Sequence, residues 1–137
     1  MFRILAAAIP AGLISLSLTA TPVQADGKRV VVDLPNLSGM PDEDAEKLIA
    51  ALAQINVITS HCPDYPISDG EWTLLVGTGD MLARQLGMDP ASYDKNYYGP
   101  AFQMLDDPAA CDRIGPKARP IIEDLISMGG GTEHVAE

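Results

Sequence analysis

The sequence predicts a small all-α protein: a bundle of three to five short helices with an extended N-terminal arm and one disulfide, Cys62–Cys111. Apolar residues after position 41 recur at steps of three and four, which is the period of an α-helix. Proline, serine and glycine stand where these apolar series begin and end, as expected at helix boundaries. The cysteines are even in number, and the chain opens like an exported protein, where thiols pair.

The first 25 residues have the features of a cleavable signal peptide. Arg3 is the only charge before Asp26, an apolar run covers 4–18, and small residues lead to Ala25. The run is shorter than the roughly 20 residues of a membrane span, and the cleavage pattern disfavours an uncleaved anchor. We therefore expect residues 1–25 to be removed, the protein to be periplasmic or secreted, and no membrane insertion after cleavage.

Export also determines how the two cysteines are interpreted. Cys62 and Cys111, 49 positions apart (62 to 111), are the only two in the chain, so only one pairing is possible. In the chain-entropy model a bridge that closes such a loop stabilises the fold by about 4 kcal/mol. We expect a structural disulfide rather than a pair of reactive thiols.

The chain is acidic. It has 19 Asp and Glu against 9 Lys and Arg, a formal net charge of −10. Binding to nucleic acid or to an anionic membrane needs basic patches, so both are disfavoured. The acidic residues are spread along the chain, which is compatible with a cationic partner or with solubility alone.

The predicted elements follow in order. Residues 26–40 should form an extended arm, because 30–34 is rich in β-branched residues but no second strand exists to pair with it. A helical domain should span 41–128, followed by a flexible tail at 129–137.

The first helix should begin with Pro41 in its first turn, followed by acidic residues that suit the helix N-terminus. Its apolar face continues to Cys62, which should therefore point inward. The other residues of that face are Ala45, Leu48, Ile49, Leu52, Ile55 and Thr59.

The second helix should start with a capping box formed by Ser68 and Glu71 and end near Gly87. Gly77 and Gly79 would let another helix approach closely. Its helical-step series consists of Trp72, Leu75, Gly79, Leu82 and Leu86.

A third element should span 90–106, with Asp89 as its cap and a kink or split at Gly99-Pro100. Cys111 should follow in a short connection. The last helix should cover 116–128, and its apolar residues are Ile121, Ile122, Leu125 and Met128.

The aromatic residues gather in the third element. Tyr93, Tyr97, Tyr98 and Phe102 are a possible partner surface, because tyrosine combines apolar area with a polar tip. Ordinary core packing is the alternative, and we expect about half of these side chains to be buried.

No catalytic or metal-binding constellation is predicted. His61 beside Cys62, with Met81, Met88 and Met104, is a weak indication of a soft-metal site, because the residues are scattered and the thiol is expected to be bridged. The adjacent carboxylates Asp106 and Asp107 are typical of a solvated helix end. We expect no cofactor and no metal.

In size, helical pattern and widely separated cysteines, the chain resembles the periplasmic acid-stress chaperones, which are small helical proteins with one disulfide. The resemblance covers the general layout, which small periplasmic immunity and inhibitor proteins share. The sequence thus favours an exported, non-enzymatic protein that binds another exported or membrane-bound protein, as a subunit, inhibitor, immunity factor or chaperone. The alternatives are a periplasmic carrier of a metal ion or small apolar ligand, and an enzyme of unrecognised type.

Overall fold

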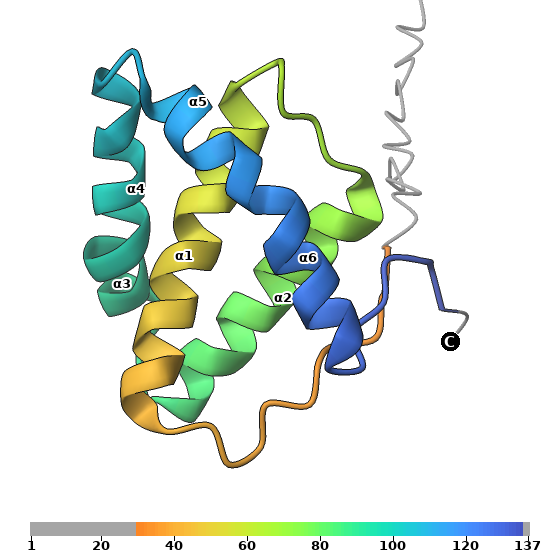
Figure 1. The fold of residues 1–137 in the computed structure, drawn as a ribbon. Helices are drawn as coiled ribbons and strands as arrows, with labels where there is room; N and C mark the ends of the chain where they lie inside the picture. The colour runs from red at the N-terminus through yellow and green to blue at the C-terminus, as the bar shows by residue number, and fades with distance from the viewer. Residues whose placement is uncertain (1–29, 136–137) are drawn as a thin grey trace, which may run out of the picture.

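The computed structural model describes residues 30–135, and all regular structure in this range is helical (Figure 1). The predicted signal peptide, the first four residues of the arm and the last two residues of the chain lie outside the described residues. Within 30–135, no helix combines the length and the apolar character needed to cross a bilayer. The all-α prediction is confirmed for this part of the chain.

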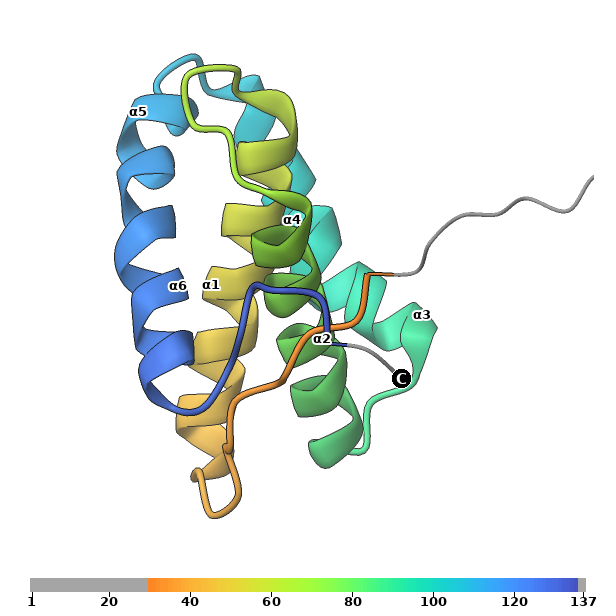
Figure 2. The same ribbon diagram turned by 90° about the vertical axis from the view of Figure 1, so that its right-hand side faces the viewer.

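α1 (Asp42–His61) is the central helix. In the view of Figure 2, α5 and α6 lie on one side of it, and α2 and the α3–α4 segment lie on the other. The predicted inward face is confirmed, since Ile49, Leu52 and Ile55 are buried. Pro41 is the residue before the helix rather than its first member, and three acidic residues fill the first turn.

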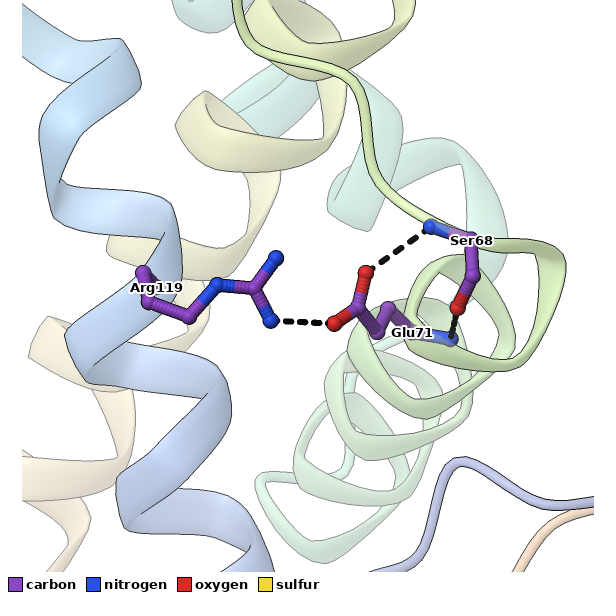
Figure 3. Close-up of polar contacts among 3 residues, drawn as sticks. All are labelled: Ser68, Glu71 and Arg119. Atoms are coloured by element: carbon purple, nitrogen blue, oxygen red, sulfur yellow. Dashed lines mark hydrogen bonds and ion pairs between the residues drawn. The ribbon is translucent and has the colours of Figure 1, made fainter.

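α2 (Asp69–Gln85) begins with the predicted capping box. The Ser68 hydroxyl accepts a hydrogen bond from the Glu71 N–H at 3.1 Å, and the Ser68 N–H donates to the Glu71 carboxylate at 2.8 Å. The other carboxylate oxygen of Glu71 accepts from Arg119 of α6 (Figure 3). The cap therefore also joins two helices.

Trp72 does not belong to the core of α2. Its side chain is 45 % exposed, whereas Leu74 and Leu82 are fully buried. Trp72 lies at the edge of the buried face, and its indole N–H donates to Asn56 of α1 at 3.1 Å. The predicted helical spacing is correct, since Trp72 and Leu75 lie near each other on the helix. The buried face is centred on Leu74 and Leu75, however, so Trp72 lies at its margin.

The glycines of α2 do allow close approach, although not of another helix backbone. A methyl group at Gly79 would overlap the hydroxyl of Tyr93, and one at Gly77 would lie 2.8 Å from the Leu34 side chain of the arm. Each glycine thus receives a side chain from a segment distant in sequence.

The chain stays helical from residue 90 to 106 in four consecutive segments. They are α3 (Pro90–Tyr93), a π-helical turn (Asp94–Tyr98), α4 (Gly99–Gln103) and a 3₁₀ turn (Met104–Asp106). Asp89 caps α3 as predicted, by accepting from the Ser92 N–H at 2.9 Å.

The π-turn allows Pro100 to lie within a continuous helical segment. The N–H of Gly99 donates to the carbonyl of Asp94, five residues back. Proline has no N–H and would press on the carbonyl four residues back in a regular α-helix. The wider turn relieves this conflict, so the predicted interruption at Gly99-Pro100 takes the form of one extra residue in the preceding turn.

The last helical stretch starts earlier than predicted. α5 (Ala110–Ile114), a 3₁₀ turn (Gly115–Lys117) and α6 (Ala118–Ser127) follow without a break, because the 3₁₀ turn accommodates Gly115 and Pro116. Cys111 therefore lies in a helix, not in a connection. The disulfide to Cys62 is present, with Cα atoms 5.8 Å apart, and Cys62 is buried as predicted.

The two ends of the described chain lie side by side. The Gly131 N–H donates to the Asp33 carbonyl at 2.9 Å, and the Val135 N–H donates to that of Val31 at 2.8 Å. Figure 1 shows this segment in dark blue beside the orange arm. The sequence predicts a flexible tail over 129–137, and nothing in it indicates this pairing. Met128, expected in the core, is 39 % exposed at the end of α6.

Candidate binding groove

A groove opens between the C-terminal half of α2 and the helical segment that follows it. Its main hollow has a volume of about 450 Å³, bounded by Asp80 and Arg84 on α2 and by Tyr93, Asp94 and Tyr98 across from them. Asp94 and Tyr98 also line a second hollow of about 390 Å³, which continues to Phe102. We call the two adjoining hollows the aromatic groove.

Asn56 of α1 links Tyr98 at the groove to Trp72, which lies outside both hollows in the N-terminal half of α2. It is only 8 % exposed. Its side chain accepts from the Trp72 indole N–H at 3.1 Å and donates to the Tyr98 hydroxyl at 2.9 Å. The Ser60 hydroxyl also donates to it at 3.4 Å. One buried amide thus holds two aromatic side chains that come from different helices.

The orientation of this amide fixes the role of Tyr98. An indole N–H can only donate, so Trp72 must face the amide oxygen of Asn56. The amide NH₂ then faces Tyr98, whose hydroxyl acts as the acceptor. Tyr98 also has a side-chain hydrogen bond with the neighbouring Tyr93. Asn56 and Tyr93 therefore fix the position of the Tyr98 ring at the groove.

Phe102 extends the aromatic surface away from Tyr98 by one turn of α4. It is 50 % exposed. The ring of His61 meets it edge to face, with centroids 5.8 Å apart and an angle of 87° between the planes. His61 Nδ1 lies 2.8 Å from the Val57 carbonyl, an acceptor only, so Nδ1 carries a proton. His61 is exposed to solvent, beside the bridged Cys62.

Tyr93 forms the inner wall. Its ring packs 5.3 Å from that of Tyr98, centroid to centroid, and its side chain is 7 % exposed. Burial raises the pKa of Tyr93, and the neighbouring Tyr98 and the carboxylates of Asp80 and Asp94 raise it further. The negative charges of Asp80 and Asp94 both disfavour ionisation of the Tyr93 hydroxyl, so both carboxylates lie near the same part of the groove.

The four aromatic residues predicted as a partner surface have different positions. Tyr98 and Phe102 line the groove, and Phe102 is the most exposed of them. Tyr93 is buried in the core and forms the inner wall of the groove. Tyr97 is partly buried, packs against both core clusters and lines neither hollow. One of the four side chains is thus buried, two are partly buried and one is exposed, where about half were expected to be buried.

Two residues of this region are absent from the predicted site. Trp72 is the only tryptophan in the chain, and a lone tryptophan in a helix is as typical of a core as of a surface. Asn56 is a polar residue within an apolar helical face. That is the one sequence signal for a buried polar connection, because such an amide needs partners.

The other residues considered for catalysis or metal binding form contacts that stabilise the fold. The Asp107 carboxylate accepts from the Ala109 N–H at 2.9 Å and pairs with Arg113 at 2.5 Å, and these contacts lower its pKa. Met81, Met88 and Met104 are partly buried against the core. Within residues 30–135, no group of three His, Cys, Asp or Glu side chains is placed to hold a metal ion.

The disulfide encloses the aromatic groove within one loop of the chain. Residues 62–111 contain α2, the π-turn and α4, which supply both sides of the groove, while α1 lies beneath them. Comparisons with protein-family models, with curated proteins and with solved structures found no match to this chain.

Proposed function

We propose that this protein is an exported, non-enzymatic binding protein that holds a segment of another exported or membrane-bound protein in the aromatic groove. One observation carries the proposal: exposed aromatic side chains from two helices flank a tyrosine whose hydroxyl is fixed by a buried amide. Preorganised aromatic residues with a polar tip are the side chains that dominate binding energy at protein interfaces.

The exposed rings of these residues would gain free energy if a partner covered them. Trp72 and Phe102 are 45 % and 50 % exposed, and they are two of the five large hydrophobic side chains exposed within residues 30–135. Covering the exposed part of such rings contributes about 25 cal/mol per Å² of apolar surface removed from water.

Export is part of the proposal and is supported by the N-terminal pattern and by the disulfide. An oxidised bridge that encloses the groove suits the periplasm or the outside of the cell. The mass of the protein purified from its own host without reductant tests this. A mass starting at Asp26 and two daltons below the reduced form is expected, and a full-length, reduced chain would contradict it.

A small-molecule carrier is the second candidate, favoured by the size of the main hollow. About 450 Å³ lies within the range of roughly 300–1,000 Å³ that is usual for ligand pockets. The hollow is bounded by charged residues on α2 and the π-turn, which suits a peptide better than a wholly apolar ligand. Native mass spectrometry separates the two, because a bound polypeptide and a bound small molecule differ in mass.

Site-specific crosslinking in the host tests the site itself. A photoreactive phenylalanine analogue replaces Phe102 in one variant and Ile126 in a control. Ile126 is 43 % exposed but lies on α6, on the other side of α1. A polypeptide adduct is expected at position 102, weaker when Trp72 is replaced by alanine, and absent at position 126. Equal adducts at both positions, or none, would overturn the proposal.

A further inference from the structure

We infer that the segment bound in the aromatic groove is basic, with an arginine or lysine side chain placed between Asp80 and Asp94 and an apolar neighbour against Phe102. This inference rests on the proposed function and names the chemistry of the partner. It is argued from three features of the groove: its carboxylates, its aromatic faces and the charge of the whole chain.

The two carboxylates face the same hollow from opposite sides. Asp80 comes from α2 and Asp94 from the π-turn, and both side chains are exposed. Neither forms an ion pair with another residue of the described chain, in which the carboxylates that do are Glu43, Asp44, Glu71 and Asp107. A cation between them would therefore gain two partners without displacing an existing one.

The aromatic rings supply the second half of the recognition. Tyr98 lies between the carboxylates and Phe102, and its ring is partly exposed. A guanidinium or ammonium group is attracted to the face of an aromatic ring, and its aliphatic stem packs on the same surface. The flat guanidinium of arginine fits best, because it can stack on a ring while it pairs with a carboxylate.

The charge of the chain points the same way over a longer range. The formal net charge is −10, so a basic partner is attracted and an acidic one is repelled before contact. Arg84 is the opposing feature, since it lies at the same rim one turn after Asp80. The three charged residues at the rim sum to −1, and removing Arg84 would make the groove more selective for cations.

The experiment is a selection of displayed random dodecapeptides on the oxidised full-length mature protein, followed by titration of the enriched peptides. Trp72 is the only tryptophan, and Asn56 forms hydrogen bonds to both Trp72 and Tyr98. A ligand that contacts Tyr98 should therefore change the fluorescence of Trp72. Enrichment of Arg or Lys next to an aromatic or aliphatic residue is expected. Replacing the basic residue of a selected peptide by citrulline or norleucine should weaken binding.

Substitutions in the groove and on α6 test whether binding depends on the charges of the groove itself. Asp80→Asn with Asp94→Asn should weaken binding about tenfold at low salt, because both exposed charge contacts to the bound cation are lost. Arg84→Gln should strengthen it about twofold. Glu123→Gln with Asp124→Asn removes the same charge from α6 and should change the affinity less than about twofold.

Three results would overturn the inference: no enriched peptides, enrichment of neutral or acidic peptides, or equal losses in the two double variants. In each case the crosslink from position 102 still reports whether the groove binds a protein at all. The failure of the charge argument is thus distinguishable from the failure of the proposed function.

Discussion

Glu71 is predicted to contribute to stability through two separable interactions. It accepts the Ser68 N–H within the capping box, and it accepts Arg119 from α6 (Figure 3). The substitution Glu71→Gln keeps an oxygen for Ser68 but removes the charge that pairs with Arg119. The substitution Glu71→Ala removes both interactions. Comparing the two variants therefore separates the cap from the link between helices.

The magnitudes follow from exposure. The Glu71 side chain is 14 % exposed, but that of Arg119 is 56 % exposed, so solvent screens the pair. An exposed ion pair contributes about 0.2–1 kcal/mol, and a helix cap contributes about 1 kcal/mol. We expect Glu71→Gln to lower the free energy of unfolding by about 1 kcal/mol and Glu71→Ala by about 2 kcal/mol.

The pH dependence has a definite sign. Burial would raise the pKa of Glu71, but the hydrogen bonds from Arg119 and Ser68 outweigh it, and the folded-state pKa is lowered. The contribution is therefore present above the unfolded-state pKa and is lost as the pH falls through the folded-state value. The difference between the wild type and Glu71→Gln should be constant near neutral pH and should shrink in acid.

The assay is urea unfolding followed by Trp72 fluorescence and far-ultraviolet circular dichroism, with comparable slopes for all variants. A double-mutant cycle with Arg119→Gln gives the coupling energy between the two side chains. High salt should reduce that coupling. A coupling of zero, or equal losses for Glu71→Gln and Glu71→Ala, would refute the reasoning.

Three further outcomes are expected. Replacing both Cys62 and Cys111 by alanine should lower the free energy of unfolding by about 4 kcal/mol in denaturant titrations, and a wild type insensitive to reductant would contradict this. Gly79→Ala should destabilise the wild type, because the new methyl overlaps the Tyr93 hydroxyl. In a Tyr93→Phe background, where the nearest ring carbon is 3.6 Å away, it should stabilise the fold by up to about 1 kcal/mol of helix propensity; the same sign in both backgrounds would disprove the contact. Because burial raises the pKa of Tyr93, stability should fall as the pH rises above about 10, and Tyr93→Phe should flatten that fall in alkaline unfolding curves; an unchanged fall would contradict it.

The features predictable from sequence are those that local chemistry decides. The helical period places Ile49 and Leu52 inward, and Ser68 with Glu71 forms a cap within one turn of chain. The disulfide was predictable from the presence of two cysteines and from the expectation that the protein is exported. The helical face and the cap depend on residues close in sequence, and two cysteines allow only one pairing.

The aromatic groove depends on contacts between distant residues, so it could not be predicted. Asn56 meets Trp72 and Tyr98 only because α1, α2 and the π-turn pack together. The backbone contacts of 131–135 with the arm likewise have no side-chain signal in the sequence. Tyr98 and Phe102 were identified by their clustering, whereas the residues that hold and flank them were not.

The π-turn sets the rotational phase of the helix that carries Phe102. Across this turn both Tyr97 and Tyr98 pack against Tyr93, with ring centroids 6.1 Å and 5.3 Å from that of Tyr93. Deleting one residue between 94 and 98 would restore a regular turn and rotate everything after it by about 100° about the helix axis. Phe102 would then leave the groove, while its distance along the axis would hardly change. In this protein the side of the helix on which Phe102 lies is determined by the number of residues in the π-turn as well as by residue type.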